Sequence, residues 1–191
     1  MAIVRAGRKA VLLVVDVQVG VMAGAWRPEP VVANVAHVVE QARAQGVPVF
    51  WVQHADDEDL ITHSPAWQWV PALVPAAGEQ RVHKRFNSSF EQTALEKHLA
   101  DLGATHLVLA GAATNFCIRA TAYAALERGY DLTLVADAHT TGDMTGPDGQ
   151  HVPAEAVVND LNATMTWLQY PGRRNAAVPT AQLDWATHAA A

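Results

Sequence analysis

The sequence predicts an α/β protein, a three-layer αβα sandwich around a parallel sheet of five or six strands. Short continuous apolar runs alternate along the chain with segments of helical periodicity. Each strand-and-helix unit spans about 25–35 residues, a length that suits right-handed βαβ crossovers. The apolar runs also lack polar alternation, as expected of strands that helices cover on both faces.

The first half of the chain sets the pattern of strands and helices. In chain order it predicts a strand at 10–15, a helix at 30–45, a strand at 47–54, a loop at 55–79, a short strand at 81–86 and a helix at 89–103. The first helix has Pro30 near its start and Gly46 just past its end, as helix termini favour. The second helix begins with a capping-box pair, Ser89 and Gln92, and ends at Gly103. Loops as long as the one expected here are often functional.

The second half of the chain continues the same alternation. In chain order it predicts a strand at 106–111, a helix at 115–128, a strand at 131–138, a turn-rich loop at 140–150 and a helix at 153–168. Gly129 ends the first of these helices, and Pro153 occupies the first turn of the second. Residues 175–186 are interpreted as a last short strand followed by a helical turn. We interpret residues 1–191 as one domain, with residues 172–191 as a C-terminal extension.

Composition limits the classes of function. A length of 191 residues suits one domain, and a net charge of −6 with scattered Lys and Arg argues against a nucleic-acid partner. The single cysteine excludes a disulfide framework and fits a reducing compartment. The N-terminus has no signal-peptide pattern, and no apolar run approaches the roughly 18 residues of a membrane helix. We therefore expect a cytoplasmic protein that binds neither membranes nor nucleic acids.

Reactive side chains follow the predicted strands at the edge where parallel sheets bind ligands. In chain order they are Asp16, His54, Lys84, Thr114, Asn115, Cys117, Asp137 and His139. A lone cysteine in a helix is most often a small apolar filler. Cys117, however, lies in the first turn of a predicted helix, where the helix dipole and free N–H groups favour a thiolate and can bind an oxyanion. Nucleophile, base and oxyanion donors at one edge would suit acyl transfer.

Three motifs in order resemble those of the isochorismatase-like cysteine hydrolases, in their amidohydrolase branch. LLVVDVQ resembles the first strand of that family with its acid, Asp16, and KRFNSSF resembles the segment with its lysine, Lys84. GAATNFCIRATAYAALERGYDLTLVADA resembles the block with the nucleophile, Cys117. The likeness runs from residue 9 to 170 and implies the Rossmann-like topology of the family.

The resemblance implies a catalytic triad of Asp16, Lys84 and Cys117. It would hydrolyse an amide or carbamoyl C–N bond of a small molecule through a thioester. Asp16 would take the thiol proton, and the charge of Lys84 would lower the pKa of the thiol. A cis peptide bond between Ala112 and Ala113 would turn the Ala113 N–H toward the Cys117 N–H to form an oxyanion hole. The family also implies a homodimer or homotetramer and no cofactor.

The substrate pocket is expected to involve residues near these motifs and in the neighbouring loops. They are Gln18, Trp26, His54, Trp67 and Asn115. Nicotinamidases of this family hold a metal through an Asp-x-His pair and further histidines. This chain has the reverse order, His54-Ala-Asp56 and then His63, so we expect no metal site. Because the namesake reaction of the family cleaves a vinyl ether without this cysteine, Cys117 favours C–N hydrolysis.

Three alternatives stay open from the sequence. The first is a papain-type triad of Cys117, His139 and Asp137. Asp137 and His139 lie two positions apart on an extended segment, so their side chains point the same way, which suits a proton relay to the thiol poorly. The second is a catalytically silent member of the family that acts as a binding or structural subunit, against which the complete triad argues. The third is a metal-containing amidase of the nicotinamidase type.

Overall fold

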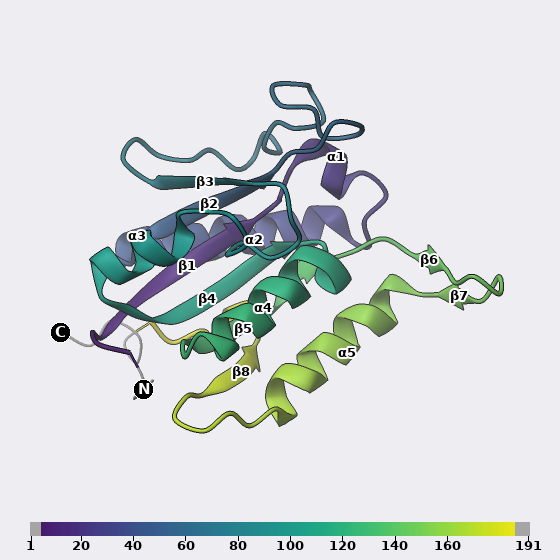
Figure 1. Ribbon diagram of the computed structural model, residues 1–191. Coiled ribbons are helices and arrows are strands. Elements are labelled where there is room, and N and C mark those ends of the chain that lie inside the picture. Colours follow the sequence, from purple (N-terminus) through teal and green to yellow (C-terminus); the bar gives the residue numbers. More distant parts are fainter. Residues whose placement is uncertain (1–4, 186–191) are drawn as a thin grey trace.

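The computed structural model describes residues 5–185 and forms the three-layer αβα sandwich that the sequence predicts (Figure 1). Six strands form one sheet in the order β3-β2-β1-β4-β5-β8, and every pairing in this sheet is parallel. The strands are β1 (Lys9–Val15), β2 (Val49–His54), β3 (Gln80–Lys84), β4 (Ala104–Ala112), β5 (Asp131–Thr140) and β8 (Asn175–Val178). The predicted fold class and the size of the sheet are thereby confirmed.

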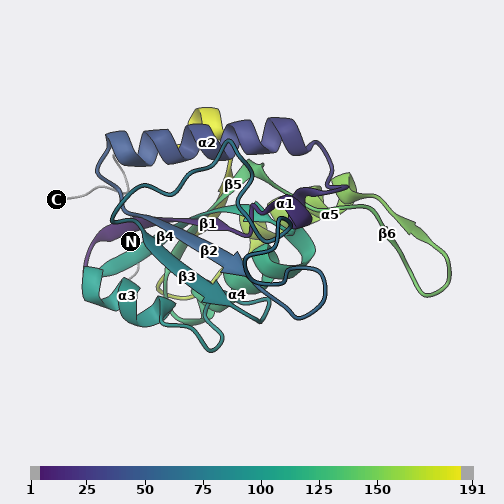
Figure 2. The same ribbon diagram turned by 90° about the horizontal axis from the view of Figure 1, so that it is seen from above.

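Helices cover both faces of the sheet. Helix α2 lies on one face, and α3 and α4 lie on the other, as the view from above shows (Figure 2). Helix α5 packs against the same core as α3 and α4. The main helices are α2 (Pro28–Ala44), α3 (Leu95–Leu102), α4 (Arg119–Glu127) and α5 (Ala154–Trp167). The smaller elements are α1 (Val19–Met22), the π-helical turn η1 (Thr114–Ile118), the 3₁₀ turn η2 (Thr180–Gln182) and a hairpin of β6 (Met144–Thr145) and β7 (His151–Val152).

The central strand β1 explains why the strands read as continuous apolar runs. Leu13 and Val15 belong to the core under α3, α4 and α5, whereas Leu12 and Val14 belong to the core under α2. Successive side chains of a strand point to opposite faces, so both faces of β1 must be apolar when both are covered. All four of these side chains are fully buried.

The start of α3 differs from the prediction. The helix begins at Leu95 rather than at Ser89, and no side chain caps it. Ser89 is buried and its hydroxyl bonds that of Thr121 at 2.8 Å, so it is not available as a cap. Gln92 has a left-handed backbone with φ 50°, which interrupts a helix at this point. The predicted capping box is therefore wrong.

Three further boundaries are corrected. The strand predicted at 81–86 ends at Lys84, and the helix predicted at 115–128 is a π-helical turn followed by α4. The loop predicted at 140–150 runs into the hairpin of β6 and β7, which projects from the body of the molecule (Figure 1). The predicted last strand and helical turn correspond to β8 and η2. Residues 1–4 and 186–191 lie outside the described part, and the division into one domain with an extension stays a prediction.

A close approach of β1 and β4 brings residues that follow these strands near one another. Val15 at the end of β1 pairs with Gly111 on β4. Gly111 has φ +129°, and a Cβ atom at this position would lie 1.9 Å from the carbonyl oxygen of Val15. Only glycine fits there, because any side chain would collide with backbone. This contact brings Asp16, which follows β1, close to the turn that follows β4. None of the helices between residues 5 and 185 has the length and hydropathy needed to cross a membrane.

Candidate active site

Three residues from distant parts of the sequence meet at the carboxyl ends of β1, β3 and β4. The Nζ atom of Lys84 lies 2.7 Å from Oδ2 of Asp16 and 3.1 Å from Sγ of Cys117. The side chains of Lys84 and Asp16 are 0% and 1% exposed, and Cys117 is 8% exposed. An acid, an ammonium and a thiol therefore form one almost dry cluster, in which their charges interact strongly.

The ammonium of Lys84 is the centre of this cluster. Besides Asp16 and Cys117, it lies 3.1 Å from the carbonyl oxygen of Phe86 and 3.2 Å from Nδ1 of His54. Burial, and after it the charge of Lys84, lowers the pKa of His54. The imidazole is therefore neutral at pH 7, and its Nδ1 accepts a hydrogen bond from the ammonium. The structure thus places His54, expected in the substrate pocket, directly beside the predicted triad.

The donor set also resembles that of a metal site. One ligand atom each from Asp16, His54 and Cys117 lies within 4.8 Å of the other two, and zinc favours these residue types. The Nζ atom of Lys84, however, lies 2.7 to 3.2 Å from these three side chains. The lysine ammonium therefore supplies the positive charge at the place where a metal ion would sit, and the residues do not fit a metal in addition.

Asp16 is held in an unusual backbone conformation. Its φ is 51°, in the left-handed region, and its N–H donates to the carbonyl of Val52 at 2.9 Å. Such a conformation costs roughly 1 kcal/mol or more and recurs at functional sites. Within residues 5–185, neither oxygen of its carboxylate accepts a hydrogen bond of regular geometry, although Lys84 lies at ion-pair distance. The carboxylate therefore retains lone pairs that can accept a proton.

The turn η1 presents Cys117 to this carboxylate. The carbonyl of Ala113 accepts hydrogen bonds from the N–H groups of Phe116 and Ile118, both at 3.1 Å, and the second of these spans five residues. A π-helical turn of this kind is rare and is common at functional sites. The peptide bond between Ala112 and Ala113 is cis.

The site acts on the pKa of the Cys117 thiol through burial and through two opposite charges. Burial and the negative charge of Asp16 raise the pKa of Cys117 to about 12, although Lys84 lowers it as expected. Desolvation penalises a thiolate more than one ammonium favours it, because that ammonium is shared with a carboxylate. The expected lowering by Lys84 is present, but burial and the charge of Asp16 outweigh it. At neutral pH the site therefore holds a protonated thiol beside Asp16.

The papain-type alternative is contradicted by the geometry. His139 forms hydrogen bonds with Thr114 at 2.9 Å and with Asn162 at 3.0 Å. The carboxylate of Asp137 accepts from the backbone and the hydroxyl of Thr180 at 2.8 and 2.6 Å. Both side chains are committed to other partners, so they do not form a relay to Cys117.

Gln18 has a structural role, and its contact with a substrate stays a prediction. It is fully buried, and its Nε2 donates to the carbonyls of His54 and Trp67 at 3.0 and 2.9 Å. Its Oε1 accepts from the N–H of His54 at 2.9 Å. The amide therefore fastens the end of β2 to the long loop.

The other expected pocket residues are also engaged in the fold. The ring of Trp67 stacks on that of His83, and Trp26 lines a cavity between α2 and α5. Asn115 accepts from the hydroxyl of Thr141 at 2.6 Å and donates to Sδ of Met144 at 2.9 Å. Their contact with a substrate stays a prediction.

Two neighbours of the predicted triad were not identified from the sequence. The Phe86 carbonyl accepts from Lys84, and Oδ1 of Asn87 lies 3.9 Å from Sγ of Cys117. Both residues belong to KRFNSSF, the motif that carries the lysine, so their position in that motif was the signal that could have identified them.

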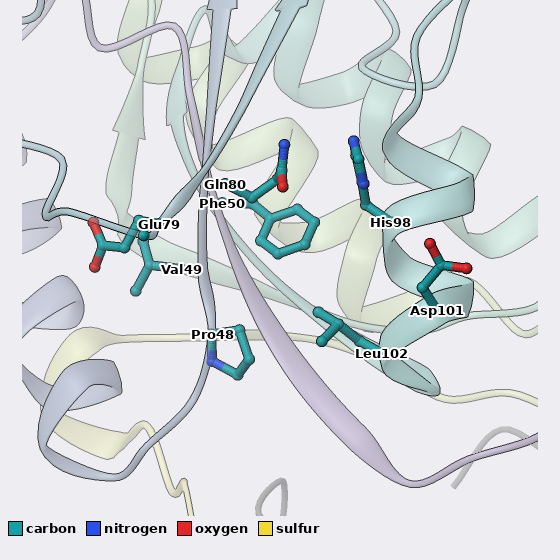
Figure 3. Close-up of a pocket in the computed structure, with 9 residues that line it drawn as sticks. Pro48, Val49, Phe50, Glu79, Gln80, His98, Asp101 and Leu102 are labelled. Atoms are coloured by element: carbon teal, nitrogen blue, oxygen red, sulfur yellow. The ribbon is translucent and has the colours of Figure 1, made fainter.

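A separate groove of about 320 Å³ lies at the opposite end of the sheet (Figure 3). Its walls are Val49 and Phe50 from the start of β2 and His98 from α3, whose ring meets that of Phe50 edge to face. His54 lies five residue steps along β2 from Val49, or about 16 Å. Because ligands bind at the carboxyl ends of parallel strands, this groove is distinct from the candidate site.

Comparison with known proteins gives consistent matches. The family model of the Isochorismatase domain matches residues 10–166. A streptothricin hydrolase of Streptomyces noursei is 33% identical over 144 residues, covering 72% of this chain and 57% of that protein. The ureidoacrylate amidohydrolase of Methylobacterium radiotolerans is 30% identical over 190 residues, covering 80% of this chain and 72% of the relative. The crystal structure of an isochorismatase from Pseudomonas putida KT2440 has a TM-score of 0.82 at 30% identity, covering 91% of this chain and 89% of the other.

These matches extend over the region that forms the site. This chain spans little more than half the length of the two streptothricin hydrolases that it matches, 57% and 54%. The segment matched by the family model, residues 10–166, contains Asp16, Lys84 and Cys117 and all strands of the main sheet except β8 and the first residue of β1. The resemblance seen in the three motifs is confirmed: the chain belongs to the isochorismatase family.

Proposed function

We propose that this chain is a cysteine-dependent hydrolase that cleaves an amide or carbamoyl C–N bond of a small molecule. The observation that carries the proposal is the buried contact of one ammonium, that of Lys84, with both the carboxylate of Asp16 and the thiol of Cys117. The names of two relatives, a streptothricin hydrolase and a ureidoacrylate amidohydrolase, support this class of reaction.

In the first step, the thiol proton of Cys117 moves to the carboxylate of Asp16 while Sγ forms a bond to the carbonyl carbon. The transfer is coupled to attack because burial keeps the free thiol protonated, with its pKa raised to about 12. The negative charge that develops on the carbonyl oxygen is bound by the N–H groups of Ala113 and Cys117. Lys84 stabilises the sulfur and the carboxylate as the proton passes between them.

In the second step, the tetrahedral intermediate collapses and the C–N bond breaks. Asp16 returns the proton to the leaving nitrogen, and the acyl group stays on Cys117 as a thioester. A water molecule then attacks the thioester while Asp16 accepts one of its protons. When the C–S bond breaks, this proton returns to the sulfur. One water is consumed, and a carboxylic or carbamic acid and an amine or ammonia are released.

The proposal is tested with a panel of small primary amides, ureido acids and carbamoyl amino compounds, read as ammonia release. Cys117→Ser and Asp16→Asn should each lower the rate by roughly a thousandfold or more, as removal of a nucleophile or base does. Lys97→Met, which removes an exposed lysine on α3, is the control and should keep the wild-type rate. Equal rates for wild type and Cys117→Ser, or no ammonia from any compound of the panel, would contradict the proposal.

Two companion expectations also stay proposals, a homodimer or homotetramer and a cytoplasmic location. Sedimentation velocity of the purified chain tests the first, and a single species with the mass of one chain would contradict it. Fractionation of the source cells tests the second.

A further inference from the structure

A second buried polar network lies beside the turn that carries Cys117. Thr114, the first residue of η1, is fully buried, and His139 near the end of β5 is 1% exposed. Their side chains meet at 2.9 Å, and His139 also meets Asn162 of α5 at 3.0 Å. None of these three side chains has a part in the proton transfers described above.

The hydrogen bonds of this network have a defined direction. Asn162 donates its Nδ2 to the carbonyl of Ala136 at 2.9 Å, so its Oδ1 is the atom that faces His139. Because Oδ1 only accepts, the Nε2 atom of His139 carries a proton. Burial lowers the pKa of His139 to about 4, so the imidazole is neutral and its Nδ1 is an acceptor. The hydroxyl of Thr114 must then be the donor to Nδ1.

This chain of bonds fixes the turn η1 to the sheet and to α5. Thr114 lies between Ala113, the first proposed oxyanion donor, and Cys117, which is both the second donor and the nucleophile. A second tie, from Asn115 to Thr141, holds the same turn from the neighbouring residue. Donors and nucleophile must be placed to within about 0.5 Å for acyl transfer, and supporting residues provide this precision.

We propose that Thr114 and His139 are positioning residues, which set the orientation of the turn from Ala113 to Cys117 through a directed chain of hydrogen bonds ending on Asn162. The inference rests on the proposed function, because the turn matters for rate only if Cys117 is the nucleophile. It assigns to His139 an indirect role in place of the direct proton relay that the sequence left open.

The surroundings of His139 allow Asn162, where the chain of hydrogen bonds ends, to be substituted. A cavity of about 160 Å³ lies against His139 and Asn162 and is also lined by Arg27 and Asp137, the charged groups on this side. Water can enter a polar cavity of this size. A shortened side chain at position 162 can therefore be hydrated, so Asn162→Ala is a variant that removes the anchor without leaving an empty core.

The decisive comparison is between Thr114→Val and Thr114→Ser. Valine keeps the shape of threonine but removes the donor, whereas serine keeps the hydroxyl. Thr114→Val should lower kcat by about tenfold or more with KM changed by less than about threefold, because the misplaced turn affects the transition state more than binding. Thr114→Ser should keep both constants within about threefold of wild type. A folded Thr114→Val with the kcat of wild type would overturn the inference.

A second readout uses the only cysteine of the chain. Alkylation of Cys117 by iodoacetamide is followed from pH 6 to 10 in the same variants, and it needs no known substrate. The groups that face the thiol are Asp16, Lys84 and His54. If the turn moves away from them, the pH profile of alkylation shifts in Thr114→Val and not in Thr114→Ser. Identical profiles in the two variants would count against a positioning role.

Two other outcomes can be distinguished: a Thr114→Val variant that does not fold, and a proposed function that is wrong. If Thr114→Val does not fold, Asn162→Ala takes its place, and a kcat or an alkylation profile equal to that of wild type overturns the inference. Failure of the proposed function has another signature, since Cys117→Ser then matches wild type in ammonia release. In that case the alkylation profiles still test the position of the turn.

Discussion

Mild acid should destabilise this protein through a single buried histidine. In the unfolded chain His139 titrates near pH 6.5, whereas in the folded protein burial lowers its pKa to about 4. Between these values the unfolded chain binds a proton that the folded protein excludes. The stabilising contribution of neutral His139 is therefore fully present above pH 6.5 and is lost as the pH falls toward 4.

The magnitude follows from the two pKa values. Their difference corresponds to about 3 kcal/mol of unfolding free energy when the titration is complete, at 1.36 kcal/mol for each pH unit. Between pH 7 and pH 5 the loss is about 2 kcal/mol, because most of the difference in proton binding falls in this interval. A change of this size is a large fraction of the stability of an ordinary domain.

The measurement is urea unfolding at pH 7, 6 and 5, followed by circular dichroism. His139→Gln is the test variant, since glutamine offers an N–H to Asn162 and a carbonyl to Thr114 but does not titrate in this range. His37→Gln, which changes an exposed histidine on α2, is the matched control. Between pH 7 and 5, wild type and the control should both lose about 2 kcal/mol more than His139→Gln.

Other titrating groups do not produce this difference in stability between wild type and His139→Gln. The lowered pKa values of Asp56 and Glu79 affect stability only below pH 4.5, and the lowered pKa of His54 is common to all three proteins. Parallel stability curves for wild type and His139→Gln between pH 7 and 5 would refute the reasoning. His139 would then be free to take up a proton in the folded protein, contrary to the bonding described for it.

Three further predictions concern the packing of the site. Lys84→Met should lower the free energy of unfolding in urea by about 3 kcal/mol or more, because it leaves a buried carboxylate unpaired. Lys97→Met, at an exposed ion pair, should lower it by less than about 0.5 kcal/mol. Equal losses would contradict the buried pairing. Gly111→Ala should abolish soluble expression, because the added Cβ atom would lie 1.9 Å from a carbonyl oxygen. Gly78→Ala is the control: Gly78 has φ +87° but open space around it, so the substitution should lower the unfolding free energy by only about 1 kcal/mol, measured by thermal unfolding. Gln18→Ala should speed native-state proteolysis of residues 55–79 several-fold, as it removes the bonds that hold this loop, and an unchanged cleavage rate would show that other contacts suffice.

The fold was predictable because its signals are local. Continuous apolar runs, helical periodicity and terminal Pro and Gly residues mark the strands and helices of a doubly covered sheet. The order of strands along the sheet brought Asp16, Lys84 and Cys117 to one edge, as the likeness to the family implied. In each of these cases the pattern in the sequence and the tertiary structure agree.

The features that could not be predicted depend on partners that lie far away in the sequence. Ser89 looks like a helix cap until Thr121, 32 residues later, takes its hydroxyl. The structural role of Gln18 depends on the carbonyl of Trp67, 49 residues later, which accepts a hydrogen bond from its amide. The pKa of Cys117 depends on how completely the thiol is desolvated, and no local pattern reports that quantity.

Lys84 stands at the end of β3, the five-residue strand at the border of the sheet. Strands at a border are held by one neighbour only, so they detach more easily than central ones. A brief separation of β3 from β2 would withdraw the ammonium and remove Val82 from its core, while the rest of the two hydrophobic cores stayed packed. If Lys84 acts as proposed, loss of the proposed activity on warming should precede melting, and the lifetime of that activity should follow the opening of one border strand rather than the stability of the whole molecule.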